Sequence, residues 1–274
     1  IQFHSYGGTG DSDSGLESKV GPLADFVNEH PELTVDVGQV MFGPTTSMTA
    51  DGPLGYFLQK LSGEKWYSCD TELESGCGIS PIRYRDRNFV NALQWAIGLE
   101  WYLRVEDPWQ VVMSSDHPNG GSFLAYPQII RLLMDASYRL ETLKRVNPRV
   151  LQTSSLSDLG REYTLSEIAI ITRAGPARIL GLRNKGHLAA GADADVVVYT
   201  PSKNYETMFS WPWMVVKAGQ IVVRNGEIQT PATGKTLSVN RDFDLDRVKQ
   251  IETWFSDHYS ISVRNYGHGR VGAD

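Results

Sequence analysis

The stretch Val111-Val112-Met113-Ser114-Ser115-Asp116-His117-Pro118-Asn119-Gly120-Gly121 decides the fold class. It begins as an apolar run with two β-branched residues, which predicts a short buried strand. It ends in Pro-Asn-Gly-Gly, a strong turn signal, so the chain leaves the strand into a loop. A carboxylate and an imidazole, Asp116 and His117, therefore follow the end of a strand. In a barrel of parallel strands, that rim is where the chemistry takes place.

Asp116 has two interpretations. A carboxylate at a strand end can ligate a metal ion through one oxygen and accept a proton from a metal-bound water. It can equally cap the loop through its side-chain oxygens, with His117 packing beside it. The stretch by itself does not separate a catalytic aspartate from a structural one.

The composition is that of an ordinary globular protein. The chain has 274 residues, 41% hydrophobic and 21% charged, enough for one large or two modest domains. A formal net charge of −6 gives no electrostatic case for binding nucleic acid or an anionic membrane. The two cysteines, Cys69 and Cys77, are too few for a disulfide framework. We therefore predict unpaired thiols and a cytoplasmic protein.

The periodicity of the first part predicts alternating strands and helices, the order of parallel crossover units. Polar residues 7–15 are expected to form a loop. The predicted strands cover residues 1–4, 33–42 and 111–115, and the predicted helices cover 18–30, 88–103 and 126–143. Because the chain starts at Ile1, inside the first predicted strand, we expect a fragment of a longer protein.

Residues 43–86 interrupt this alternation. They have no clear period apart from a short helical piece near 54–61, and a long excursion of this kind usually serves as a lid, a substrate wall or a partner surface. Gly78, which follows Cys77, allows the backbone to approach a ligand closely. Arg83 and the two arginines after it could bind ligand carboxylates, or they could form a solvated basic turn.

The chain changes character after residue 182. Residues 165–182 are expected to form two short helices broken at Gly175-Pro176. Short strands follow, and Asn225-Gly226 is a hairpin signal. These strands cover 196–199, 214–217 and 220–224, and a last helix covers 244–255. The predicted division is a partial barrel at 1–182, a small all-β sandwich module at 183–240, and a helix with a tail at 241–274.

Two segments resemble the exit from the barrel in the amidohydrolase superfamily. They are Thr172-Arg173-Ala174-Gly175-Pro176-Ala177-Arg178-Ile179-Leu180-Gly181 and the stretch from Gly186 to Tyr199. The resemblance implies an α/β fold, the C-terminal part of a TIM-like (β/α)8 metallo-hydrolase barrel joined to a β-sandwich. Members of this superfamily hydrolyse C–N and related bonds with one or two metal ions.

Four shorter segments carry a more specific resemblance. They are Gln2-Phe3-His4-Ser5-Tyr6-Gly7, Cys77-Gly78-Ile79 with Pro81, Gln94-Trp95-Ala96-Ile97-Gly98-Leu99-Glu100, and Asp116-His117-Pro118-Asn119-Gly120-Gly121. They resemble the family of A subunits found in formylmethanofuran dehydrogenase and in the formyltransferase/hydrolase complex. The resemblance covers nearly the whole chain, corresponds to the C-terminal half of those proteins, and implies the other subunits of the complex as partners.

The resemblance implies roles for individual residues. His4 would be the sixth-strand metal-binding histidine. Asp116 would be the eighth-strand aspartate, which binds metal and shuttles the proton. An imidazole and a carboxylate suit Zn²⁺, and the intact protein would hold two zinc ions. The residues expected to contact the substrate are His117, Asn119, Cys77, Gly78 and Arg83.

The superfamily also needs a His-x-His pair, a lysine and a further histidine on earlier strands, which would precede Ile1. We therefore expect the fragment to be inactive without the missing N-terminal half of the same protein. If the barrel prediction holds, His4 and Asp116 approach to on the order of 3–6 Å. Because three strands cannot close a barrel of eight, the isolated chain is not expected to be a stable monomer.

The leading hypothesis is metal-dependent hydrolysis or formation of the N-formyl bond of formylmethanofuran or a related furan amine carrier, in one-carbon metabolism such as methanogenesis. The first alternative is another amidohydrolase, similar to dihydroorotase or hydantoinase. The second is a non-catalytic scaffold subunit that kept the fold, against which the presence of both His4 and Asp116 counts. Zinc content of the full-length protein discriminates the scaffold from the enzymes.

Overall fold

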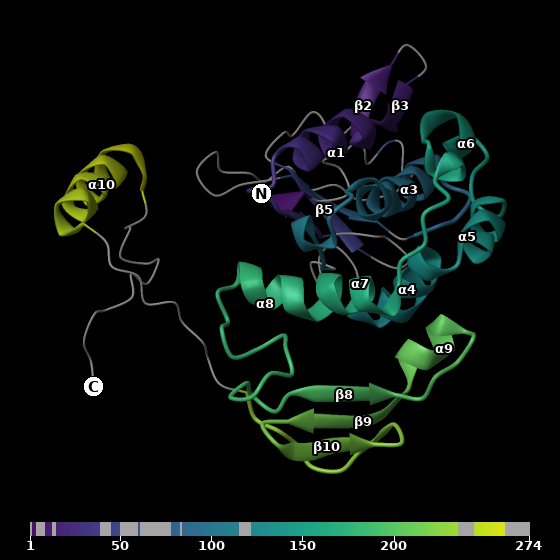
Figure 1. Ribbon diagram of the computed structural model, residues 1–274. Helices are drawn as coiled ribbons and strands as arrows, with labels where there is room; N and C mark the ends of the chain where they lie inside the picture. The colour runs from purple at the N-terminus through teal and green to yellow at the C-terminus, as the bar shows by residue number, and fades with distance from the viewer. Residues whose placement is uncertain are drawn as a thin grey trace. The chain divides into compact units, whose positions relative to one another are not determined.

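The computed structural model (Figure 1) describes residues 2–3, 9–12, 15–38, 45–49, 60, 78–82, 84–114, 122–234 and 244–260. The chain separates into two compact units, Ile1–Pro231 and Ala232–Asp274. The boundaries near residues 182 and 240 stay predictions. Within the described ranges, no helix is long and apolar enough to cross a membrane.

A three-stranded parallel sheet organises the first unit. Its strands are β1 (Gln2–Phe3), β4 (Val35–Val37) and β7 (Val111–Met113), in the order β1-β4-β7. The helices α1 (Val20–Glu29) and α3 (Phe89–Arg104) lie between them in sequence. The predicted α/β class is therefore confirmed, with mixed helices and a parallel sheet. Closure into an eight-stranded barrel stays a prediction.

Helix α3 is the centre of the hydrophobic core. Every residue from Val90 to Leu103 is buried, because the helix is apolar on most of its circumference and is packed on several sides. Asn88 caps its N-terminus by accepting a hydrogen bond of 3.1 Å from the Asn91 N–H. The helix predicted at 88–103 is thereby confirmed. Because it is buried all round, its few polar side chains lie inside the core as well.

Gln110 joins the end of α1 to the start of β7. Its buried Nε2 donates to the carbonyl oxygens of Val27 at 2.9 Å, His30 at 2.9 Å and Leu33 at 3.2 Å. Carbonyls at a helix C-terminus have no partner inside the helix. The Gln110 amide therefore provides a donor for carbonyl oxygens at the end of α1 and in the turn after it, and it holds the start of β7 beside that turn.

Two predictions for the region before residue 144 were wrong. Residues 9–12 and 15 do not belong to the predicted loop, because the strands β2 (Thr9–Ser12) and β3 (Gly15–Ser18) pair antiparallel. The polar residues here show no apolar alternation from which strands could be predicted. The single helix predicted at 126–143 is two helices, α4 (Tyr126–Met134) and α5 (Ala136–Leu143). Asp135 separates them because it is extended and its side chain accepts from the Tyr138 N–H at 2.8 Å, which starts a new helix.

The excursion at 43–86 has a strand near each end. The strands β5 (Thr45–Thr49) and β6 (Gly78–Ile82) pair antiparallel, with Thr49 opposite Gly78. Neither strand was predicted, because neither shows a clear alternation of apolar and polar residues. The helical piece predicted near 54–61 lies outside the described residues except for Lys60, which is helical.

The helix break predicted at Gly175-Pro176 is absent from the described residues 165–179. Here α7 (Leu165–Ala169), a π-helical turn at Ile170–Ala174 and α8 (Gly175–Ile179) follow without interruption. The Gly175 N–H donates to the Ile170 carbonyl across five residues. This wider turn carries the chain past Pro176, which stands in the first turn of α8, where its missing N–H costs least.

An antiparallel sheet follows, in the order β11-β10-β9-β8. The strands are β8 (Val196–Tyr199), β9 (Pro212–Lys217), β10 (Gln220–Arg224) and β11 (Glu227–Ile228). The hairpin at Asn225-Gly226 is confirmed, with positive φ of 50° and 78°. Helix α9 (Tyr205–Ser210) lies between β8 and β9 in sequence and packs against α4. The prediction that this module contains only strands was therefore wrong. The described residues show one sheet, and the sandwich stays a prediction.

The remaining helices are short, apart from α10 in the second unit. They are η2 (Pro108–Gln110), η3 (Phe123–Ala125), α6 (Val150–Thr153), η4 (Leu156–Asp158) and α10 (Leu245–His258). Asp244 caps α10 by accepting from the Asp246 N–H at 2.9 Å. The last helix is thereby confirmed, ending three residues beyond the predicted 255.

Candidate functional site

The carboxyl ends of β1, β4 and β7 form one edge of the parallel sheet. Phe3 is opposite Val37, and Val37 is opposite Met113, so the last residues of the three strands are level. The next residues in sequence are His4, Gly38 and Ser114. Enzymes built on parallel barrels place their chemistry at this edge. The register therefore makes it the candidate site, although His4 and Asp116 lie outside the described residues.

Tyr102 of α3 lies beneath this edge. Its hydroxyl donates to the carbonyl of Val37 at 3.3 Å. The side chain is 0% exposed. Burial raises the pKa of Tyr102 well above its ordinary value, and the neighbouring Tyr126 and Asp36 raise it further. The hydroxyl is therefore a neutral donor that links α3 to the end of β4.

Most of the predicted site residues are not tested by the structure. His4, Cys77, Arg83, Asp116, His117 and Asn119 lie outside the described residues. Gly78 is described only as the first residue of β6. In the ranges of the chain that are described, no group of three or more His, Cys, Asp or Glu side chains could hold a metal ion.

Glu100, the last residue of the Gln94–Glu100 motif, has a structural role. Its carboxylate is fully buried and accepts from the Ser155 N–H at 2.5 Å, from the Ser155 hydroxyl at 2.6 Å and from the Ser18 hydroxyl. Arg104 donates to the Ser155 hydroxyl at 2.6 Å. A buried carboxylate needs such partners. The motif's charged residue thus ties α3 to β3 and to the segment before η4.

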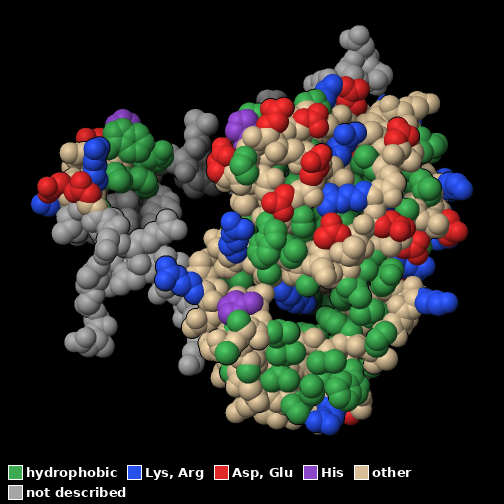
Figure 2. Space-filling model, viewed as in Figure 1, with side chains coloured by type: hydrophobic (Ala, Val, Ile, Leu, Met, Phe, Trp, Pro, Cys, Tyr) green, Lys and Arg blue, Asp and Glu red, His purple; other side chains and the backbone are tan. Residues whose placement is uncertain are grey.

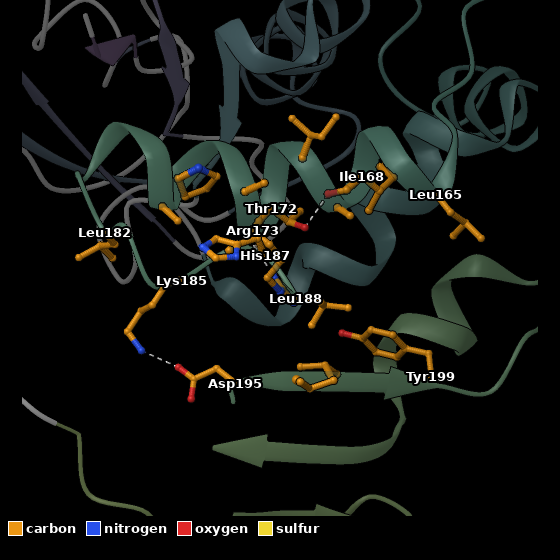
Figure 3. A pocket seen from close by; sticks show the side chains of 18 of the residues that line it. Leu165, Ile168, Thr172, Arg173, Leu182, Lys185, His187, Leu188, Asp195 and Tyr199 are labelled. Carbon is orange, nitrogen blue, oxygen red and sulfur yellow. Dashed lines mark hydrogen bonds and ion pairs between the residues drawn. The ribbon is translucent and has the colours of Figure 1, made fainter. Parts of the chain in front are cut away.

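A cavity of about 600 Å³ lies between the helical segment 165–180 and the antiparallel sheet (Figure 3). Figure 2 shows that face of the first unit hollowed between these two layers. The lining is mainly apolar: Leu165 and Ile168 come from the helical segment, Leu188 from the loop after it, and Val197 and Tyr199 from β8. Gly78, the predicted site residue that the structure describes, is not among the residues that line it.

The polar groups at the cavity bond to one another or to the main chain. Lys185 pairs with Asp193 and Asp195, both at 2.7 Å, and Lys217 pairs with Asp195 at 2.6 Å. The two lysines and the Ala218 N–H hold the pKa of Asp195 well below its usual range. The His187 Nε2 bonds to the Arg183 carbonyl at 2.9 Å. This arrangement suits the packing of apolar groups better than hydrolytic chemistry.

Sequence reasoning missed Tyr102. It identified residues 88–103 as a buried helix, but it gave the phenol no role. The available signal was a tyrosine late in an otherwise apolar helix, since a buried Tyr hydroxyl usually finds a hydrogen-bond partner. Which partner it finds depends on the sheet behind it, which the helix pattern does not contain.

Comparison with known proteins agrees with the resemblance drawn from the motifs. Protein FwdA of Methanocaldococcus jannaschii is 41% identical over 277 residues, covering 97% of this chain and 48% of that protein. The A subunit of the formyltransferase/hydrolase complex Fhc of Methylorubrum extorquens is 38% identical over 274 residues, covering 97% of this chain and 49% of that protein. The chain thus spans about half the length of the curated relatives it matches.

A solved structure is also similar. One chain in the crystal structure of the formyltransferase/hydrolase complex (FhcABCD) from Methylorubrum extorquens with methylofuran superposes with a TM-score of 0.82 at 37% identity. The match covers 97% of this chain and 50% of the other. The model of the amidohydrolase family matches residues 4–223, most of the chain. The chain therefore belongs to the amidohydrolase family.

Proposed function

We propose that the protein containing this chain hydrolyses or forms the N-formyl bond of formylmethanofuran or of a closely related furan amine. The observation that carries the proposal is the level register of β1, β4 and β7, because His4 and Asp116 follow the first and last of these strands in sequence. The substrate class is supported by the relative from a formyltransferase/hydrolase complex, and by the similar structure that contains methylofuran.

The side chains that we propose as ligands are of the types that bind zinc. An imidazole from His4 and a carboxylate from Asp116 are common zinc ligands, but two protein ligands are fewer than the usual three of a catalytic site. In the proposal, further ligands come from other parts of the protein, and two zinc ions are held in all. When bound, the metal ions supply Lewis-acid activation of water and of the formyl carbonyl.

Asp116 moves the proton in this proposal. In hydrolysis, a water oxygen bonds to the formyl carbon and the C–N bond breaks. The Asp116 carboxylate accepts the water proton and passes it to the leaving nitrogen, so that formate and the free amine result. The reverse sequence joins formate to the amine. In the dehydrogenase version, another subunit would make that formate. The substrate contacts proposed here are His117, Asn119, Cys77, Gly78 and Arg83.

The proposed partners are the other subunits of such a complex and the remaining half of the same protein, in the cytoplasm. The Fhc relative is itself one component of a multisubunit complex. Exposed aromatic side chains near the antiparallel sheet support further contacts: Trp211 is 63% and Trp213 is 45% exposed. Contiguous exposed apolar surface often marks an interface.

The test replaces Asp116 by Asn in the full-length protein. Asparagine can still cap a loop but cannot take a proton at neutral pH, so we expect formyl-amine hydrolysis to fall about 10²–10⁴-fold. The matched control is Asp107→Asn. Asp107 caps η2 just before β7, accepting from the Trp109 N–H at 2.9 Å, so its replacement reports on the loss of a structural aspartate alone.

Zinc content and circular dichroism of both variants accompany the rates. The control should keep hydrolysis within about threefold of the parent, since a cap contributes only to stability. If Asp116→Asn also stays within about threefold, well short of the loss expected for a proton carrier, Asp116 is a loop cap and the mechanism is wrong. A zinc-free parent would instead indicate a scaffold.

A further inference from the structure

The cavity between the helical segment 165–180 and the antiparallel sheet borders the edge of β8 rather than a face of the sheet. Successive side chains of a strand point to opposite faces, yet Val196 and Val197 both line the cavity, as does Tyr199. Val215 of β9 is opposite Val197, but no residue of β9, a strand described throughout, lines the cavity. Figure 1 shows β8 as the strand of this sheet nearest to α8. The open space therefore lies alongside β8, where a further strand would pair.

The strand β8 also has an unusual sequence for the edge of a sheet. Among the described strands the order is β11-β10-β9-β8, so β8 pairs with β9 on one side. Edge strands are commonly short, charged or interrupted by proline, which keeps other chains from pairing with them. The opposite edge strand, Glu227–Ile228, is short and carries a charge. By contrast, Val196–Tyr199 has neither a charge nor a proline, and its one irregularity is a register shift at its end.

The apolar residues around the cavity are incompletely buried. The strand β8 reads Val-Val-Val-Tyr, a continuous apolar run that favours burial on both faces, but all of its residues are only half-buried. The comparable run Val-Val-Met of β7 is buried throughout. Leu165, Leu180 and Leu188 line the cavity and are 51%, 60% and 82% exposed, and Figure 2 shows apolar side chains in both layers around the hollow. Native interiors contain few voids larger than a water molecule, so we expect a space of about 600 Å³ with such walls to be filled in the intact protein.

We propose that an extended apolar segment, from the part of the protein outside these 274 residues, lies in the cavity and pairs with the free edge of β8 as a further strand. The matches to the relatives cover 97% of this chain but 48% and 49% of the two curated proteins, so about half of each relative has no counterpart here. The inference requires such a further part of the protein, but it does not depend on the N-formyl chemistry.

A small molecule fits the cavity less well than a strand does. The volume is within the range of ligand pockets, about 300–1,000 Å³, but such pockets direct a few polar groups at the ligand. Here Lys185 and Asp195 pair with each other at 2.7 Å, and the His187 Nε2 bonds to the Arg183 carbonyl at 2.9 Å. A small molecule would also leave the backbone edge of β8 unpaired. An added strand supplies backbone hydrogen bonds and apolar side chains together.

The test measures amide hydrogen exchange at residues 196–199 in the full-length protein, purified alone. In an antiparallel strand the N–H groups of alternate residues point to opposite sides, so β9 can protect only two of the four amides of β8. A strand on each side protects all four, and we expect each of them to exchange at least about 100-fold more slowly than in the unfolded chain. Two fast-exchanging amides in β8 would overturn the inference.

Val197→Lys and Ile228→Lys form a matched pair of variants. Val197 lines the cavity, whereas Ile228 belongs to the opposite edge strand and is 79% exposed. Beside an open cavity, the new ammonium group would reach water along its flexible stem, and both variants would behave alike. Under a docked strand the charge is buried, so Val197→Lys should lower the denaturant midpoint clearly more than Ile228→Lys. Equal midpoints would contradict the proposal, and if Val197→Lys does not fold, the exchange of the parent protein decides.

Two further measurements identify what fills the cavity. The exchange is repeated at lower protein concentration and with the other subunits added, and a photo-reactive amino acid placed at Val197 is cross-linked and mapped by mass spectrometry. We expect unchanged protection, and a cross-link to residues of the same polypeptide outside these 274. Protection that needs high concentration indicates a second copy, and protection that needs the other subunits indicates a partner subunit. Either result, or a cross-link confined to the present chain, overturns the inference, whereas the activity of Asp116→Asn has no bearing on it.

Discussion

Replacing Arg139 by Met should destabilise the protein strongly, because this guanidinium cross-links three segments from inside the core. Arg139 is 1% exposed. Its Nη1 donates to the Leu132 carbonyl at 2.6 Å, and its Nη2 donates to the carbonyls of Leu159 and Arg161 at 2.7 and 2.9 Å. The side chain thus holds α4, α5 and the segment after η4 together.

The magnitude follows from those three bonds. A hydrogen bond to a charged group contributes about 1.5–3 kcal/mol, and each buried carbonyl left without a donor costs about 1–3 kcal/mol. Burial lowers the pKa of Arg139, although Glu162 and Asp135 nearby raise it, so the buried charge carries a desolvation cost that Met removes. Methionine also keeps most of the apolar stem packed. The expected loss is about 3–5 kcal/mol in the free energy of unfolding.

The assay is denaturant unfolding of the full-length protein, followed by circular dichroism, with midpoints compared at equal slope. Arg145→Met is the matched control. Arg145 is close by in sequence, its side chain is 70% exposed, and its ion pair with Glu141 spans 4.0 Å. Its loss should cost less than about 0.5 kcal/mol. If Arg139→Met costs under about 1 kcal/mol, or no more than the control, the three carbonyls do not depend on this arginine and the reasoning is wrong.

Two further predictions concern the junction between the helices and the antiparallel sheet. Gly186 has φ +79°, and an added Cβ would lie 2.7 Å from the Ala177 Cβ. Gly191 has φ +89°, but an added Cβ there would have nothing within 4 Å. Gly186→Ala should therefore lower the unfolding midpoint clearly more than Gly191→Ala, and equal midpoints would contradict this. Lys185 and other donors hold the pKa of Asp195 below its ordinary value of 3.8, so the ionised carboxylate stabilises the fold above about pH 4 and loses that contribution as the pH falls below it. The stability difference between the parent and Asp195→Asn should accordingly shrink from about pH 7 to about pH 3, and a difference independent of pH would exclude the linkage.

Local sequence patterns were enough to place the elements whose signal lies within a few residues. The apolar circumference of residues 88–103 predicted α3, which runs from Phe89 to Arg104. Asn225-Gly226 predicted the hairpin between β10 and β11. Glycine and asparagine tolerate positive φ wherever they stand, and helical periodicity reports burial without reference to a partner. The family motifs are likewise short stretches, and the comparisons confirmed the family they indicated.

Only the tertiary structure decided which strands pair with one another and which side chains those elements contact. The pairing of Phe3 with Val37, and of Val37 with Met113, joins residues far apart in sequence and depends on the whole core between them. The same holds for the Tyr102 hydroxyl on the Val37 carbonyl, for Glu100 on Ser155 and for α9 on α4. The break at Asp135 illustrates the physical reason: an apolar helical pattern continues through residues 126–143, but a side-chain cap and the packing of Arg139 favour two helices over one. Sequence periodicity encodes which face is buried, whereas long-range hydrogen bonds and packing select the partner.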